Sequence, residues 1–271
     1  MHPMKLFAKL TFRESIRNKW ITYFGAAFAM LAFLLSLVGS GETSALSSFD
    51  RSAAMLLNIL LLFVPLLGLT LGAQLISADR ESGALVYLLS QPVTKRQLFF
   101  GKAIGASAAM IAAVSIGFAV AGFGIALSGG GGVMGFLILW SCAMFFILVC
   151  IGMGMLISTL SLNRSRAIGV ALLAWFGFTI LSDLGLMGTA YVLRLRSEGV
   201  VGLALLNPLE VFKILTVRLL ANNLEALGAG GVYLDFLVGG LLPYLLSLWL
   251  LVMMLVSFFG AYWLFSNQEE I

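Results

Sequence analysis

Six runs of apolar residues dominate the chain, and each is long enough to cross a lipid bilayer as a helix. A helical span needs about 20 apolar residues. The six runs contain 19 to 27 residues each, and Asp183 is the single charged residue within them. They are Trp20–Val38, Ala53–Ile76, Ala103–Leu127, Met134–Leu160, Ala167–Leu193 and Gly239–Phe265. We therefore predict an all-α polytopic membrane protein, with residues 1–271 forming one domain of six transmembrane helices.

The composition agrees with a membrane protein. The chain is 61% hydrophobic and 10% charged, and its mean hydropathy of +1.07 lies outside the range of soluble globular domains. The alternating segments of about ten residues that build transmembrane β-barrels do not occur in the sequence. A secretory signal peptide has a shorter apolar core than Trp20–Val38, so we interpret this run as a retained first span.

The distribution of Lys and Arg predicts the orientation, because cytoplasmic loops carry an excess of both. With the N-terminus inside, eleven of the sixteen basic residues fall on the cytoplasmic side and five on the outer side. We therefore expect both termini in the cytoplasm. The pI near 9.2 then reflects a basic belt beside anionic lipid rather than nucleic-acid binding.

Residues 1–19 precede the first span and carry a basic stripe. Lys5, Lys9, Arg13 and Arg17 recur every four residues, which places them on one side of a helix. Leucines lie close to the stripe, so the amphipathic pattern is imperfect. We predict an interfacial helix that lies on the inner leaflet.

Residues 77–102 connect the second and third spans as a cytoplasmic loop. The pattern predicts a short helix over 79–90, with acidic residues in its first turn, where the helix dipole favours them. Three leucines then form an apolar stripe at helical spacing, and Pro92 ends the helix. Such a helix could dock into a groove on another protein or lie on the lipid surface. The pattern alone leaves both open.

Several residues of this loop resemble the coupling segment of ABC-2-type transporter permeases. They are Glu81-Ser82-Gly83-Ala84-Leu85, Leu88-Leu89-Ser90, Pro92-Val93, Arg96 and Gly101-Lys102. Ala84 and Val86 depart from the family's threonine and second glutamate. The N-terminal stretch from Phe12 to Trp20 also looks like the family's pre-membrane helix. The resemblance implies that the residues coupling this chain to an ATPase are Asp79, Glu81, Gly83, Leu85, Leu88, Leu89, Pro92 and Arg96.

The sequence contains no phosphate-binding loop of the form G-x-x-x-x-G-K-[ST]. The Gly101-Lys102 pair is preceded by Arg96 where the first glycine would stand. We therefore expect a permease without enzyme activity or cofactor of its own, with ATP and Mg²⁺ bound by a separate ATPase subunit. The resemblance implies two ATPase copies, a permease homodimer and a location in the bacterial inner membrane.

Groups for catalysis or metal binding are scarce. His2 is the sole histidine, so zinc sites and triads built on histidine pairs are excluded. Cys142 and Cys150 share the fourth span with several methionines, a soft ligand set that suits Cu(I), although Met and Cys more often serve packing. Asp183 suggests a proton relay or, more often, a structural carboxylate. We predict no catalytic residue and no metal site.

Residues 194–238 form the longest outer connection and contain a short helix. Asn207, Pro208 and Glu210 suit its N-cap, N1 and N3 positions, with Glu210 reaching back toward the cap. About 14 residues are too few to span, so we expect this helix to lie in the outer interface or to re-enter it. The helix would be a docking or gating element whose charged side, with Lys213 and Arg218, serves an extracytoplasmic partner, or it would be a plug that merely seals the outer end of the dimer.

The run LLNPLEVFKI, which contains the asparagine-proline start of this helix, resembles the NosY-like branch of the family. These permeases serve nitrous-oxide reductase maturation with an ATPase and a periplasmic copper-handling protein. The resemblance implies a periplasmic accessory partner and a role in copper-site maturation. Alternatives that stay open are a mechanical or scaffolding subunit that transports nothing, a secondary transporter and, on weaker grounds, a membrane enzyme.

Overall fold

A computed structural model describes residues 3–38, 45–127, 133–183, 197–221 and 238–268. Within these ranges every regular element is a helix, which confirms the all-α class. The helices are α1 (Pro3–Arg17), α2 (Lys19–Val38), α3 (Ala45–Glu81), α4 (Ala84–Leu89), α5 (Lys95–Leu127), α6 (Val133–Leu160), α7 (Arg164–Asp183), α9 (Ser197–Leu206), α10 (Pro208–Ala221), the 3₁₀ turn η3 (Gly239–Leu241) and α12 (Leu242–Asn267).

Among the described residues, five helical segments are long and apolar enough to cross a membrane. They belong to α3, α5, α6, α7 and α12. The predicted first span corresponds to α2, but its described apolar part, Thr22–Leu34, is shorter than such a segment. The polytopic membrane architecture is confirmed, whereas the count of six spans is not. The predicted fifth span begins earlier than expected, at Arg164, and its residues 184–193 lie outside the described ranges.

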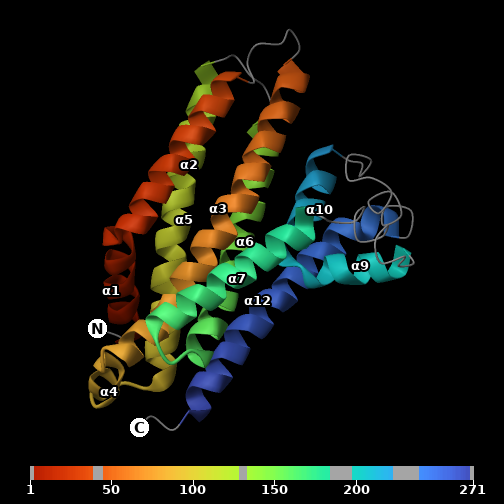
Figure 1. Cartoon of the computed structure of the whole chain (residues 1–271). Coiled ribbons are helices and arrows are strands. Elements are labelled where there is room, and N and C mark those ends of the chain that lie inside the picture. The colour runs from red at the N-terminus through yellow and green to blue at the C-terminus, as the bar shows by residue number, and fades with distance from the viewer. Residues whose placement is uncertain (1–2, 39–44, 128–132, 184–196, 222–237, 269–271) are drawn as a thin grey trace.

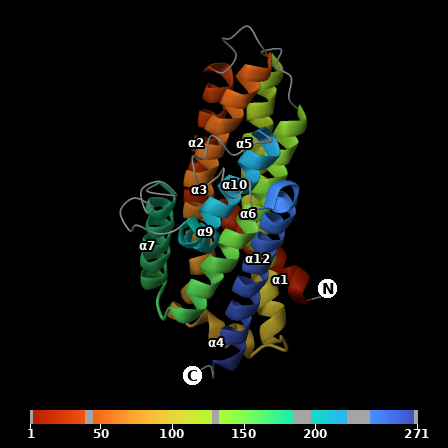
Figure 2. The same ribbon diagram turned by 90° about the vertical axis from the view of Figure 1, so that its right-hand side faces the viewer.

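The long helices α2, α3, α5 and α6 run side by side along the molecule (Figure 1). The start of α1, the end of α12 and the whole of α4 lie near one end of this bundle, which we call the α4 end (Figure 1). Helix α7 stands on one flank (Figure 2). Helices α9 and α10 lie part-way along the bundle rather than beyond its far end (Figures 1 and 2).

One close helix contact in the bundle joins α3 to α6 through glycines. A Cβ atom added at Gly72 would lie 2.5 Å from the Ile151 carbonyl oxygen and 2.9 Å from Gly154 Cα. A Cβ atom at Gly154 would lie 2.5 Å from the Leu69 carbonyl oxygen. Small residues let membrane helices approach at the backbone, where van der Waals packing replaces the hydrophobic effect. This contact fixes α6 against α3.

Helix α1 packs along α5 instead of lying on lipid alone. Its buried residues Phe7, Thr11 and Ser15 recur every four positions, and glycines of α5 receive them. A Cβ at Gly105 would lie 2.4 Å from the Ala8 carbonyl oxygen. The basic stripe of α1 is exposed on the opposite side. The prediction of an inner-leaflet helix therefore missed that one face of α1 belongs to the bundle.

The polar segment between the second and third spans is folded differently from the prediction. Helix α3 continues to Glu81, and Gly83 adopts a left-handed conformation (φ 72°) that separates α3 from α4. Glycine takes this conformation without steric penalty and commonly ends helices in this way. The single helix predicted over 79–90 is therefore wrong. Asp79 and Glu81 lie in the last turn of α3, not in the first turn of a coupling helix.

Helix α5 starts with a reciprocal cap that the prediction did not include. The Thr94 hydroxyl accepts a hydrogen bond from the Gln97 amide at 3.2 Å, and the Gln97 side chain accepts one from the Thr94 amide at 3.1 Å. This pairing is a capping box, which satisfies two amides that helix geometry leaves unpaired. It sets α5 to begin at Lys95, so the non-helical part of the predicted loop is short.

Candidate coupling site

Helix α4 combines a buried anchor with an exposed apolar pair. Leu85 is 1% exposed within the main core, and Leu88 and Leu89 pack against that core as half-buried residues. Val86 and Tyr87 are 55% and 68% exposed. The leucine stripe that begins with Leu85 therefore faces the chain's own helices, and Leu85 itself is not accessible for docking. The accessible apolar residues of α4 are Val86 and Tyr87.

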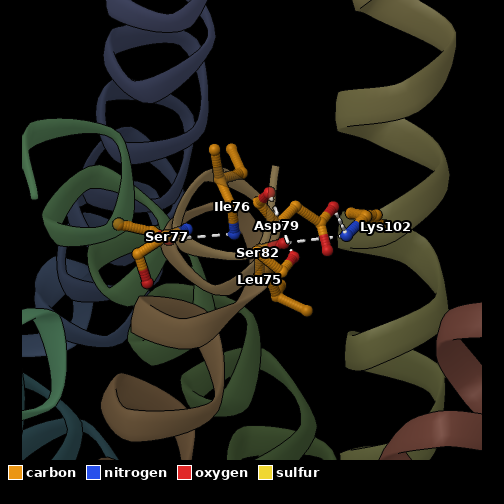
Figure 3. A network of polar contacts seen from close by, with 7 residues as sticks. Leu75, Ile76, Ser77, Asp79, Ser82 and Lys102 are labelled. Atoms are coloured by element: carbon orange, nitrogen blue, oxygen red, sulfur yellow. Dashed lines mark hydrogen bonds and ion pairs between the residues drawn. The ribbon is translucent and has the colours of Figure 1, made fainter. Parts of the chain in front are cut away.

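Lys102 joins α5 to the last turns of α3. Its Nζ donates a hydrogen bond of 2.9 Å to the Leu75 carbonyl oxygen and forms an ion pair with Asp79 (Figure 3). The side chains of Lys102 and Asp79 are 10% and 21% exposed. A charge this far from water is tolerated when it is paired and hydrogen-bonded. Asp79 therefore acts inside the chain, where it holds α5 against α3.

Ser158 of α6 contacts the same part of α3. Its Oγ accepts hydrogen bonds from the backbone amides of Ile76 and Ser77 at 3.0 and 2.9 Å (Figure 3 labels the two donors). The Ser77 hydroxyl in turn donates to the Ala73 carbonyl oxygen at 2.6 Å. A side chain that inserts beside a helix's own hydrogen-bond ladder ties two helices together without a charge. This contact lies on the same pair of helices as the Gly72–Gly154 approach.

Glu81 caps the start of α7. Its Oε2 accepts a hydrogen bond of 2.7 Å from the backbone amide of Arg164, the first residue of α7. The Arg164 guanidinium donates to Gln74 Oε1 at 2.6 and 3.0 Å. A carboxylate suits a helix N-terminus because unpaired amides and the helix dipole favour negative charge there. The end of α3 therefore holds the first turn of α7 through two side chains.

Arg80 and Lys95 bind the ends of α6 and α12. Arg80 donates to the Ser161 and Thr159 carbonyl oxygens at 2.7 and 3.2 Å and also binds the Gln268 side chain. Lys95 donates to the Gln268 and Ser266 carbonyl oxygens at 2.6 and 3.2 Å. Cationic side chains satisfy the carbonyls that a helix C-terminus leaves unpaired. Through these contacts α3, α5, α6 and α12 meet at the α4 end.

The other predicted coupling residues lie at the surface. Gly83, Pro92 and Arg96 are exposed around α4 and at the start of α5. Sequence reasoning missed Arg80, Lys95 and Lys102 as structural cations, although their positions close to predicted span ends were a signal. Helix C-termini need donors, and basic side chains near span ends commonly supply them.

Asn207 caps α10 in the predicted way, whereas Glu210 does not. Asn207 Oδ1 accepts a hydrogen bond from the Leu209 amide at 3.0 Å, which confirms the N-cap. Glu210 does not reach back. Its Oε2 accepts a 2.5 Å hydrogen bond from Ser182 Oγ of α7, while the Asn207 amide donates to the Ala204 carbonyl oxygen. The predicted capping box is therefore wrong, because Ser182 takes the carboxylate.

Helix α10 is enclosed by the bundle and contacts α3, α6, α7, α9 and α12. Phe212 stacks on Phe146 of α6 with ring centroids 4.3 Å apart and an interplanar angle of 4°. Pro208 is buried, Glu210 is 3% exposed, and Lys213 lies 3.7 Å from it with its side chain 25% exposed. The prediction of an outward charged side is wrong for Glu210, whereas Arg218 is half-buried.

A cavity of about 470 Å³ lies beside α10, between α6 and α12. Its lining is mostly apolar, with Cys142, Ser141, Tyr244 and Ser247 as polar or polarisable groups. Within the described ranges, no three His, Cys, Asp or Glu side chains come close enough to hold a metal ion. The side chain of Asp183 lies outside the described part of the structure.

Comparison with known proteins identifies the family. The model of a family described as "ABC-2 family transporter protein" matches residues 6–269. The chain belongs to this family. This ABC-2 permease is similar to two relatives described as "Probable ABC transporter permease protein NosY". The one from Stutzerimonas stutzeri is 27% identical over 269 residues, covering 95% of this chain and 97% of the relative. The one from Pseudomonas aeruginosa is 27% identical over 240 residues, covering 83% and 84%.

Proposed function

We propose that this ABC-2 permease forms a homodimer in the bacterial inner membrane and binds two separate ATPase subunits at the α4 end. The observation that carries the proposal is the division of α4 into a buried anchor, Leu85, and an exposed pair, Val86 and Tyr87. A short helix that offers apolar side chains from a rigid support suits docking into a groove. The excess of basic residues at this end favours its location in the cytoplasm.

Contacts around α4 support its role in coupling. The residues that flank α4 bind α5 through Asp79, α7 through Glu81, and α6 and α12 through Arg80. A partner that displaces α4 would therefore act on four membrane helices at once. Such coupling requires that the partner binds one arrangement of the helices more tightly than the other.

Assignment of ATP hydrolysis to another subunit is supported by the place of the Gly101-Lys102 pair. Both residues lie inside helix α5, where Gly101 packs under Phe7 and Lys102 pairs with Asp79. ATP and Mg²⁺ would be bound by the partner ATPase.

A narrower proposal is export, or motion delivered to a periplasmic accessory protein, in nitrous-oxide reductase maturation. The similarity to two permeases named NosY and the LLNPLEVFKI run support it. The enclosure of α10 favours a gate within the bundle over a docking surface for the accessory protein. A mechanical subunit that transports nothing remains the competing proposal. The two proposals are separated by measuring ATP hydrolysis and the uptake of candidate substrates together in proteoliposomes, with and without the accessory protein.

Docking through α4 is tested by replacing Val86 and Tyr87 with Asp together. We expect the variant to insert and stay monodisperse while losing copurification of the ATPase. Each apolar hot-spot residue contributes about 2 kcal/mol or more to binding, so the affinity should fall more than roughly 100-fold. Binding is measured by pull-down with the coexpressed ATPase subunit and by ATP hydrolysis of the purified complex.

The matched control replaces Ser90 and Gln91 with Asp. These exposed neighbours receive the same two charges, but no apolar side chain is lost. This control should keep the ATPase. Replacement of Leu85 with Asp should instead destabilise the permease itself, because Leu85 is buried. Full retention of the ATPase by the Val86→Asp, Tyr87→Asp variant would refute docking through α4.

A further inference from the structure

Helix α7 packs on α3 through small buried side chains. Its fully buried residues near the α3 contact are Ala167 and Ala171, which meet Leu69 and Ala73 of α3. Alanine side chains bury little apolar area, so they contribute little to holding the helix. Much of the rest is exposed, with Leu173 at 72%, and α7 lies on one flank of the bundle (Figure 2).

The middle of α7 also contains a polar atom that its packing does not satisfy. Trp175 packs beside the α3 contact, and its indole Nε1 is buried without a hydrogen-bond partner. Buried donors are paired in the great majority of native contacts, and an unpaired one calls for an explanation. Because the contact between α7 and α3 leaves this donor unpaired, α7 can move along α3 at a lower free-energy cost than a helix whose polar groups are all paired.

Polar contacts hold α7 at both of its ends. At the α4 end, Glu81 and Gln74 bind Arg164, as described above. At the other end, the Ser182 hydroxyl donates to Glu210 of α10 at 2.5 Å, and the Asn207 side chain donates to the Phe178 carbonyl oxygen at 2.8 Å. Both contacts reach α10, since Asn207 is its N-cap. Arg164 and Ser182 are about 27 Å apart along the helix axis at 1.5 Å per residue.

We propose that α7 is a rigid link that couples the α4 end to the position of α10, with Glu81 and Ser182 as positioning residues at its two ends. A displacement of α4 would move Glu81 and the first turn of α7. The last turn of α7 would then move Ser182 and the Phe178 carbonyl, and α10 would shift out of its enclosed place. The source of that displacement rests on the proposed ATPase partner, but the linkage is a property of this chain alone.

The test is a double-mutant cycle with a cysteine reporter on α10. Thr216 is fully buried in α10, so we expect a Thr216→Cys thiol to react only when α10 moves. The background carries Cys142→Ser and Cys150→Ala to remove the native thiols. The measured quantity is the rate at which a small maleimide labels the full-length permease in detergent or nanodiscs.

Ser182→Ala should raise the labelling rate roughly tenfold, since a lost hydrogen bond to a buried charged group shifts an equilibrium by about that factor or more. Glu81→Ala acts on the first turn of α7, about 27 Å from Ser182 along the helix, and should raise the labelling rate several-fold. The double variant should label more slowly than the product of the two effects, because either change alone already releases α7. Substitutions at distant, independent sites normally act multiplicatively on such a rate.

Two control variants separate the link from general loosening. Thr179→Ala removes an α7 hydroxyl that bonds to the Trp175 carbonyl within the same helix, and Arg166→Ala removes an exposed cation from the turn that holds Arg164. Both should leave the rate unchanged. If Glu81→Ala proves unstable, Glu81→Gln keeps an acceptor oxygen and should give an intermediate rate.

Two results would overturn the proposal: an unchanged rate in the Glu81 variants, or a double variant whose effect equals the product of the single effects. Neither result depends on the ATPase, because the permease is labelled alone. Failure of the proposed function would appear separately, as a wild-type permease that does not bind the ATPase subunit.

Discussion

At the residue scale, Lys102 shows how this apolar chain carries a charge among its helices. The side chain extends from α5 toward the last turns of α3, where a carbonyl and a carboxylate both accept from its ammonium group. Such an arrangement stabilises the fold only while both partners are present. With one partner gone, the remaining charge is desolvated without compensation.

Asp79→Ala should therefore destabilise the permease by at least about 2 kcal/mol, which is below the range for a fully buried pair because the Asp79 side chain retains some exposure. Loss of folded protein is measured by thermal unfolding or SDS titration in detergent. The double variant Asp79→Ala, Lys102→Met should recover part of this loss, since it removes the orphaned charge. Equal stability of Asp79→Ala and the wild type would show that the ion pair is not structural.

At this scale, how well a hydrogen bond could be predicted depended on how far apart its two residues lie in the sequence. The Asn207 cap could be predicted because its acceptor and donor lie two residues apart. The partner of Glu210 could not, because Ser182 is 28 residues away and only packing of α7 on α10 brings it close. The same holds for Arg80, whose acceptors belong to two distant segments, the end of α6 and residue 268.

At the element scale, the pairing of α3 with α6 depends on the absence of side chains. Gly68 also belongs to this contact, since a Cβ there would lie 2.6 Å from Cys150 Cβ. Gly68 and Gly72 are one turn apart on α3, and Cys150, Gly154 and Ser158 follow the same spacing on α6. Because the groups in the way at Gly72 are backbone atoms, they cannot move aside as a flexible side chain would.

Gly72→Ala should consequently separate α3 from α6 and destabilise the permease by about 2 kcal/mol or more, within or above the usual range for overpacking. Gly177→Ala is the matched control on α7, where nothing lies within 4 Å of an added Cβ. This change should be neutral or stabilise by up to about 1 kcal/mol, since alanine favours helices over glycine. Unfolding in detergent compares the two, and equal effects would contradict the packing argument.

The helices themselves were the most predictable elements, because long apolar runs in a membrane leave the backbone no other way to satisfy its hydrogen bonds. Their ends were less predictable. The pattern over 79–90 is compatible with one continuous helix, and only the left-handed Gly83 divides it. The packing of α1 on α5 brings Gly101 and Gly105 against Phe7 and Ala8. The periodicity of the sequence does not predict this contact between distant segments.

At the scale of the whole molecule, the α4 end gathers the start of α1, the end of α12, α4 and the α6–α7 turn on one side (Figure 1). Apolar runs alone predicted a helix bundle, but they did not predict which helices lie next to each other. Every run is hydrophobic, and the choice of neighbouring helix depends on small residues and polar contacts. These four segments lie at the same end of the bundle. Their common location agrees with a chain that crosses the bundle from end to end an even number of times.

Topology follows as a prediction for intact cells. Cysteines introduced at Ser90 and Ser165, both exposed at the α4 end, should resist an impermeant thiol reagent added from outside and react after the membrane is opened. Reporters at Gly130 and Glu225, which lie outside the described residues, should react from outside. A reversed pattern would place the α4 end outside and contradict the charge bias of the loops.

The binding of residues 266–268 by Arg80 and Lys95 has a practical consequence for fusion proteins. A fluorescent domain joined without a linker to Ile271, three residues after Gln268, would crowd the surface proposed for ATPase docking and would pull on two cations that hold α6 and α12. A flexible Gly/Ser linker of roughly ten residues, with a mean reach of about 15–20 Å, would carry the domain clear of this surface. Loss of activity in a tightly fused protein would then reflect the attachment, not the permease.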